Sequence, residues 1–84
     1  MNPFDSRYYN EDDLKDAGFK SLGRNVQIDK SCIIFGIKNI KIGNNVRIDA
    51  YCTIIATGHG WLNLGSFIHI GAGCHLLAGG DPYG

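Results

Sequence analysis

The sequence has no net charge that would direct it toward a charged partner. Its 84 residues include eight lysine or arginine residues and eight aspartate or glutamate residues. Such a balance provides no electrostatic footprint for nucleic acid or for an anionic lipid surface. We therefore expect a neutral partner or another protein, and no nucleic-acid partner.

Long apolar segments are also missing. No run approaches the roughly 20 apolar residues that cross a bilayer, and the first residues lack the charged and apolar regions of a secretory signal. These absences predict a soluble, cytoplasmic chain without membrane insertion. The length allows one small domain, near the size at which a single core only just stabilises a fold.

The three cysteines form neither a disulfide framework nor a zinc ribbon, because their number is odd and no C-x-x-C pair occurs. Each cysteine instead lies at the same place in a repeated phrase. The phrase reads IDKSCII at 28–34, IDAYCTII at 48–55 and IGAGCHLL at 70–77. A repeat of this kind has to be analysed before any helix or strand is assigned.

The repeat has three long copies, each built from six-residue units. The copies span residues 22–36, 42–56 and 64–78, and they agree at nearly every apolar position. Each unit has an aliphatic anchor, usually preceded two residues earlier by another apolar residue, and this alternation is typical of a strand. Glycine, aspartate and asparagine between the anchors tolerate the positive φ of a sharp bend. The anchors are Leu22, Ile28, Ile34, Ile42, Ile48, Ile54, Leu64, Ile70 and Leu76.

This pattern predicts an all-β solenoid. Three short strands and three corners complete one triangular coil, and each strand pairs in parallel with its counterpart in the next coil. Parallel connections generally turn to the right, so the physical rule alone favours a right-handed coil. Cys32, Cys52 and Cys74 are expected to point inward as small apolar residues about 4.8 Å apart. Their aliphatic neighbours argue against a metal site.

The units in residues 22–81 resemble the hexapeptide repeat of left-handed β-helix acyltransferases. The resemblance, closest to sugar O-acetyltransferases, implies a left-handed parallel β-helix of about three coils. It also implies acetyl-CoA as co-substrate, no metal, a sugar hydroxyl or amine as acceptor, and a role in surface-polysaccharide synthesis. Members commonly place their active sites between the subunits of a homotrimer, so we expect the chain to associate with itself.

A helical cap is predicted for residues 1–21, and a short tail for 82–84. Asn10 is a suitable N-cap, and the acidic residues after it suit the positive end of a helix. The helix should run over 11–17 and end at Gly18. Leu14, Ala17 and Phe19 would then cover the open first coil, whose apolar interior and strand backbone would otherwise be exposed.

Two inserts interrupt the repeat at the same corner. The spacing between anchors grows to eight residues after Ile34 and to ten after Ile54. The second insert contains His59, and the resemblance implies that His59 is the catalytic general base. Trp61 and Asn63 are the candidate residues for binding substrate or cofactor. Two simpler interpretations stay open: His59 is an inert loop residue, and Trp61 packs against a neighbouring subunit.

The other two histidines are expected to face outward. His69 and His75 each precede an anchor, and His69 is in line with Gln27 and Arg47, which indicates a solvated or inter-subunit face. A zinc site like that of β-helical hydratases would need a second subunit, because the three histidines fall at different places on the coils. Glycine-rich phosphate-binding motifs are absent from the sequence.

The sequence ends just after the third coil, whereas the enzymes it resembles continue for several more. We therefore expect either a truncated acyltransferase or a short form. The open coil favours self-association, through side-by-side trimers or end-to-end stacking. The alternative function is a non-catalytic β-helical remnant or self-assembly module.

Overall fold

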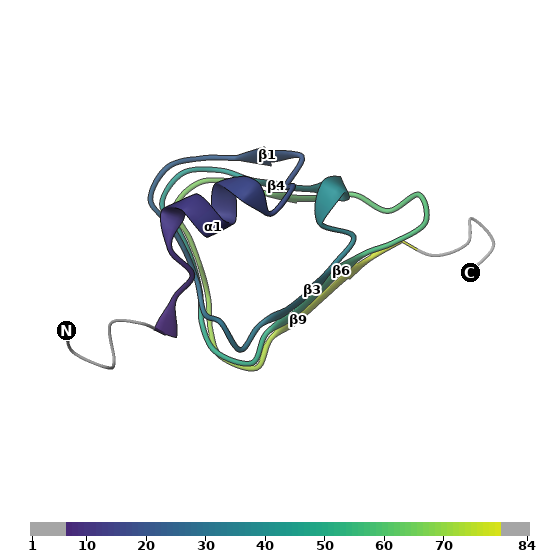
Figure 1. Cartoon of the computed structure of the whole chain (residues 1–84). Coiled ribbons are helices and arrows are strands. Elements are labelled where there is room, and N and C mark those ends of the chain that lie inside the picture. Colours follow the sequence, from purple (N-terminus) through teal and green to yellow (C-terminus); the bar gives the residue numbers. More distant parts are fainter. Residues whose placement is uncertain (1–6, 80–84) are drawn as a thin grey trace.

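Three walls of parallel strands enclose a triangular interior (Figure 1). The structure is a computed structural model and describes residues 7–79. One sheet has the order β1-β4-β7, the second β2-β5-β8 and the third β3-β6-β9. The strands are β1 (Ser21–Leu22), β2 (Val26–Ile28), β3 (Ile33–Phe35), β4 (Ile40–Ile42), β5 (Val46–Ile48), β6 (Thr53–Ala56), β7 (Leu62–Leu64), β8 (Ile68–Ile70) and β9 (His75–Ala78).

The register of these sheets is the one that the repeat predicts. Ile28 pairs with Ile48 and Ile48 with Ile70 along one wall. Ile34, Ile54 and Leu76 are likewise in register along another wall. The parallel, triangular coil is thus confirmed.

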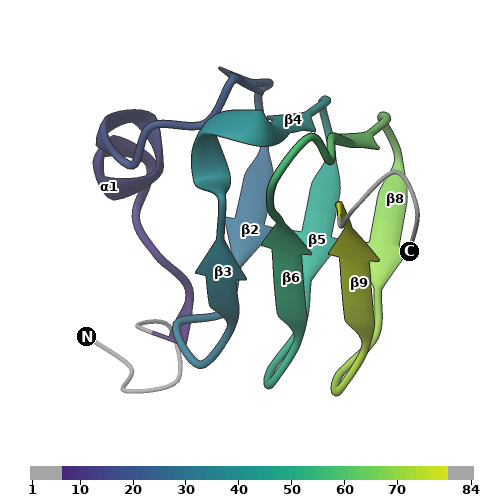
Figure 2. The same ribbon diagram turned by 90° about the vertical axis from the view of Figure 1, so that its right-hand side faces the viewer.

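The coils are left-handed. Figure 1 looks along the axis with α1 nearest, and the chain runs counter-clockwise from β1 through β2 to β3. Figure 2 shows from the side that the later coils lie progressively farther from α1. A counter-clockwise path that recedes is a left-handed screw, as the family resemblance implies and against the general rule for parallel crossovers.

The core is a column of aliphatic side chains from all three walls. Ile28 and Ile48 are completely buried, and Ile40, Val46 and Ile54 nearly so. Most of the best-buried residues belong to the second coil, which has a coil on each side. Burial of a large aliphatic side chain contributes about 1.5–3 kcal/mol, so this column is the main source of stability.

Of the residues expected at the corners, the asparagines take the predicted positive φ and the glycines beside them do not. Positive φ occurs at Asn25 (57°) and Asn45 (58°), whereas Gly23 and Gly43 do not adopt it. A Cβ on Gly23 would instead overlap the backbone of Gly43 in the next coil. These glycines are therefore needed for close approach between coils, and asparagine provides the left-handed conformation.

The cysteine ladder is only partly as predicted. Cys32 and Cys52 are buried, and their thiols donate to carbonyl oxygens of the next coil, at 3.0 Å to Asp49 and 3.1 Å to Gly71. Burial raises the pKa of the Cys32 thiol and keeps it protonated for this role. Cys74 is exposed, which corrects the prediction, because no further coil covers it within residues 7–79.

A helix and an N-terminal segment cover the first coil. Helix α1 (Glu11–Asp16) starts where Asn10 Oδ1 accepts a 2.8 Å hydrogen bond from the Asp13 amide. Leu14 is buried and Phe19 packs against the core, as predicted. Ala17, predicted to be the last helical residue and part of the cover, is instead the C-cap of α1 and is exposed. Tyr8 forms an antiparallel bridge with Asp29, so the edge of β2 is also partly paired.

The ends of the predicted segments, 1–6 of the cap and 80–84 with the tail, lie outside the described residues. The part of the chain that the structure describes contains no helix long and apolar enough to cross a membrane.

Both inserts emerge at one corner, as predicted. The first forms the 3-10 helix η2 (Ile37–Asn39) between β3 and β4, and the second is the loop 57–61 between β6 and β7. Figure 1 shows the two segments at the same corner of the triangle, where the loop extends farther outward.

Candidate functional site

His59 lies in an exposed loop, as the second insert predicts. Gly58 has a φ of 60°, and the Gly60 amide donates to the Thr57 carbonyl at 2.9 Å, so a tight turn presents the histidine to solvent. A Cβ on Gly60 would overlap Gly79, which fixes the turn against the end of β9. The loop therefore holds the His59 imidazole at the surface, where a ligand can reach it.

Trp61 ends the loop that carries His59 and directly precedes β7 of the β1-β4-β7 wall. The residue is 58% exposed, and the Lys20 ammonium lies 5.5 Å from the ring centroid, within cation–π range. Asn63 is exposed on β7, where it pairs in register with Lys41 of β4. Beside the loop, a ligand would therefore meet the Trp61 ring, the Asn63 amide and the ammonium groups of two lysines.

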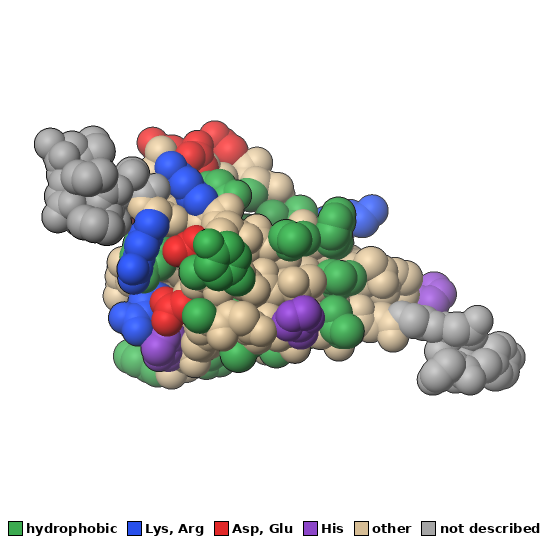
Figure 3. All heavy atoms as spheres, turned by 90° about the horizontal axis from the view of Figure 1, so that it is seen from below, with side chains coloured by type: hydrophobic (Ala, Val, Ile, Leu, Met, Phe, Trp, Pro, Cys, Tyr) green, Lys and Arg blue, Asp and Glu red, His purple; other side chains and the backbone are tan. Residues whose placement is uncertain are grey.

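The three histidines do not converge. His59 is in the corner loop, His69 in β8 and His75 in β9, and Figure 3 shows histidine side chains at separate places on the molecule. Among residues 7–79, no group of three or more histidine, cysteine, aspartate or glutamate side chains is placed to hold a metal ion.

His69 belongs to a polar network on the outer side of the β2-β5-β8 wall. Its Nε2 lies 2.6 Å from Asp49 Oδ2 and 2.9 Å from Arg47 Nη2. Arg47 Nε is also 3.2 Å from Asp49 Oδ1. Residues from two successive coils thus form one cluster because the register stacks Arg47 on His69.

The position of His69 Nε2 gives both ring tautomers a partner. Arginine is always a donor and an ionised aspartate always an acceptor. When Nε2 carries a proton it donates to Asp49, and when it does not it accepts from Arg47. The ring orientation is therefore held in either state, and the second ring nitrogen stays available on a side chain that is half exposed.

The network stabilises the ionised form of Asp49. The hydrogen bond from His69 is the main cause that lowers the pKa of Asp49, and the charge of Arg47 acts in the same direction. A carboxyl group whose pKa is lower in the folded state stabilises the fold above its unfolded pKa, and that contribution is lost as the pH falls through the folded pKa.

Replacing Asp49 by asparagine should therefore weaken the acid sensitivity of the fold. We expect the parent chain to lose stability below about pH 4, the unfolded pKa of aspartate, and Asp49→Asn to lose less over the same range. Urea denaturation at a series of pH values measures both. Asp16→Asn, at the exposed end of α1, is the control and should follow the parent. Identical profiles for Asp49→Asn and the parent would contradict the assignment.

An open hollow of about 330 Å³ lies beside this network. It runs along the outer side of the wall and ends at the corner before β8. Its lining combines amide, guanidinium, imidazole and aromatic groups, from Asn25, Gln27, Asn45, Arg47, Phe67 and His69.

The network of Arg47, Asp49 and His69 was not predicted, although the sequence contains a signal for it. Gln27, Arg47 and His69 were expected on the same outward-facing line of strand positions, but Asp49 was interpreted only as a corner residue. Positions 47 and 49 point to the same outer side because side chains alternate along a strand. Opposite charges two residues apart, followed one coil later by a histidine, would have indicated a network.

Comparison with known proteins decides the relationship. No protein-family model matches the chain. An Escherichia coli dTDP-4-amino-4,6-dideoxy-D-glucose acyltransferase is 41% identical over 73 residues, which are 87% of this chain and 38% of the relative. The chain is homologous to the hexapeptide-repeat sugar acyltransferases.

Solved structures of such acyltransferases share the coil. AntD, an N-acyltransferase from Bacillus cereus in complex with dTDP and 3-hydroxybutyryl-CoA, has a TM-score of 0.76 and 39% identity over 82% of this chain and 35% of AntD. A mutant AntD bound to dTDP-4-amino-4,6-dideoxyglucose and coenzyme A has a TM-score of 0.69 and 40% identity over 75% of this chain and 32% of that one. The chain thus spans less than half the length of the acyltransferases it matches.

Proposed function

We propose that this chain serves acyl transfer from an acyl-CoA thioester to the amine of a nucleotide-linked sugar. The single observation that carries the proposal is the 41% identity to a dTDP-aminosugar acyltransferase. AntD structures with coenzyme A and dTDP support the same pair of ligands. AntD is an N-acyltransferase, which favours an amine over the sugar hydroxyl as the acceptor.

In this proposal His59 is the general base. Its imidazole takes the proton from the acceptor amine as the nitrogen attacks the thioester carbonyl. The C–N bond forms, the C–S bond breaks, and the imidazolium returns the proton to the departing thiolate. Histidine suits this exchange because its pKa lies near working pH.

Trp61 and Asn63 are proposed to bind the substrates beside that loop. The exposed Trp61 ring can stack on a sugar or a base, and the Asn63 amide can hydrogen-bond to a hydroxyl. Lys20, already over the Trp61 ring, adds a positive charge that suits a phosphate.

We further propose that the chain works as a homotrimer with sites between subunits, that acetyl-CoA is the donor, and that the product enters polysaccharide synthesis.

The test is transfer by the purified chain itself. It is incubated with acetyl-CoA and dTDP-4-amino-4,6-dideoxyglucose while thiol release and the N-acyl product are measured. We expect saturable acetyl-CoA binding by calorimetry and an N-acylated product. Absence of the N-acylated product would overturn the proposal, whether or not acetyl-CoA binds.

The role of His59 has a matched control in His75. We expect His59→Ala to slow transfer by about 10²–10⁴-fold, the usual contribution of a general base. His75→Ala, which removes another exposed histidine, should leave the rate unchanged. A His59→Ala variant as fast as the parent would remove this residue from the mechanism.

A further inference from the structure

Phe67 has a backbone conformation that its own side chain does not favour. It has a φ of 60° at a corner where the two preceding coils place Asn25 and Asn45, at 57° and 58°. Asparagine adopts the left-handed region readily, and a bulky aromatic residue rarely does. The third coil therefore carries a strained residue where the repeat itself provides an unstrained solution.

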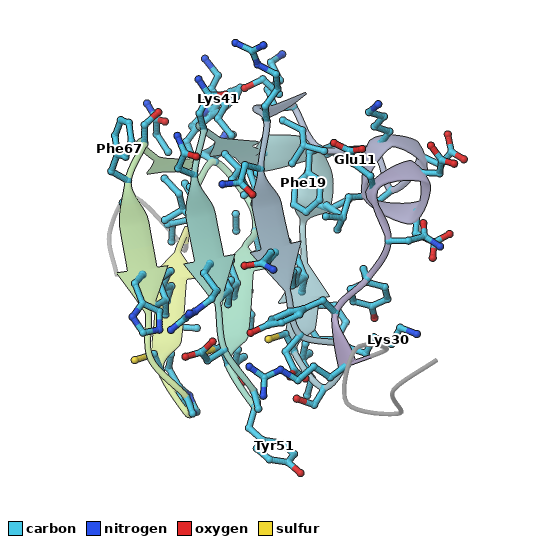
Figure 4. All side chains as sticks on the ribbon, turned by 90° about the vertical axis from the view of Figure 1, so that its left-hand side faces the viewer. Glu11, Phe19, Lys30, Lys41, Tyr51 and Phe67 are labelled. Atoms are coloured by element: carbon cyan, nitrogen blue, oxygen red, sulfur yellow. The ribbon has the colours of Figure 1, made fainter. Side chains whose placement is uncertain are left out.

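Packing within the chain does not compensate for this strain. The Phe67 side chain is 83% exposed, and Figure 4 shows it projecting from the corner at the end of the β2-β5-β8 wall. A strained, exposed residue that also borders a hollow lined by polar side chains points to a role outside the fold. An exposed aromatic ring at this position is suited to stack on a planar group.

The neighbours of Phe67 favour a polar, anionic ligand. In the hollow of about 330 Å³ it lies with Arg47, His69 and the amides of Gln27 and Asn45. The guanidinium fork of arginine matches the oxygens of a phosphate. Asp49 holds Arg47 and His69 in place at 3.2 and 2.6 Å, and it offsets one positive charge, which limits the affinity for an anion.

We propose that this hollow binds a nucleotide, whose base stacks on Phe67 while its phosphates contact Arg47 and His69. The site is separate from the loop that carries His59, since it lies on the outer side of a different wall. The choice of nucleotide rests on the proposed function. Both substrates of that reaction contain a base and a diphosphate, the acceptor in its dTDP part and the donor in coenzyme A.

The experiment titrates the purified chain separately with dTDP and with coenzyme A, by calorimetry and by the imidazole NMR signals of His69. We expect saturable binding of at least one of them, with a shift of the His69 signals. Tight binding of dTDP assigns the hollow to the acceptor, and tight binding of coenzyme A assigns it to the donor. No saturable binding of either compound would overturn the proposal.

Phe67→Asn separates binding from folding. The change restores the residue of the earlier coils, so its Tm should rise, while stacking is lost and the dissociation constant should increase about tenfold or more. Tyr51→Asn is the matched control, because Tyr51 also has a φ of 60° and is 74% exposed, at a corner outside the hollow. It should raise the Tm and leave binding unchanged.

The phosphate contact is tested by Arg47→Gln, which should also weaken binding about tenfold or more, as loss of a charge-assisted contact does. Unchanged affinity in Phe67→Asn or in Arg47→Gln would overturn the site. Acyl transfer is measured on the same samples. If a nucleotide binds at this hollow but no acyl transfer occurs, the site stands and the proposed function is overturned. If transfer occurs but Phe67→Asn binds the nucleotide as tightly as the parent, the proposed function stands and the site is overturned.

Discussion

Replacing Gly36 by alanine is expected to lower the free energy of unfolding by more than about 4 kcal/mol, which is exceptional for one methyl group. Gly36 has a φ of 73° where η2 begins, and a Cβ there would overlap the carbonyl oxygen of Ala56 in the next coil. The coil cannot move aside, because β3 and β6 are paired up to Phe35 and Ile55, the residues directly before Gly36 and Ala56. We expect far-ultraviolet circular dichroism to show a largely unfolded chain at room temperature.

Gly73→Ala is the matched control for this effect. Gly73 has nearly the same φ, 75°, but a Cβ there would meet no atom within 4 Å. Only the conformational cost remains, about 1–2 kcal/mol for an alanine in the left-handed region. Equal destabilisation by both changes would show that the close approach between the coils is not what requires Gly36.

Replacing Ile48 by alanine should lower the free energy of unfolding by about 2–5 kcal/mol. Ile48 has no exposed surface, and it is in register with Ile28 on one side and Ile70 on the other. Pairing of β5 with both neighbouring strands prevents the walls from closing over the gap, so the cavity persists. Urea denaturation measures the loss.

The same substitution at Ile33 provides the comparison. Ile33 is also an isoleucine in a strand, but its side chain is 51% exposed on the outer side of β3. We expect Ile33→Ala to cost less than about 1 kcal/mol, because little surface returns to water. If the two variants lose similar amounts of stability, the interior assigned to the coil is wrong.

The fold was largely predictable because the spacing of the repeat shows which residues pair between neighbouring coils. Residues 20 or 22 positions apart share a role, so the sequence alone aligns Ile28, Ile48 and Ile70. The inserts had to share a corner for the same reason. Asn10 was recognisable as an N-cap because a helix start depends on local chemistry. The hand of the coil followed only from the resemblance, since the physical rule favours the opposite screw.

Other features depend on contacts between coils that the pattern does not describe. The need for Gly23 arises from the backbone of Gly43, and the exposure of Cys74 from the lack of a covering coil in the described part of the chain. The corner position of the loop that carries His59 was predictable from the length of its insert, whereas the Arg47–Asp49–His69 network forms between side chains of different coils. The role of His59 as general base stays a prediction.

Methyl NOE spectroscopy on isoleucine-labelled protein can show whether the three coils stack in register. In-register stacking predicts strong contacts from Ile48 to both Ile28 and Ile70, which are its partners in the register. It predicts weak or absent contact between Ile28 and Ile70, because two strand spacings separate them by about 10 Å. Direct Ile28–Ile70 contacts, or Ile48 contacts to only one of the two, would contradict the stacked coil.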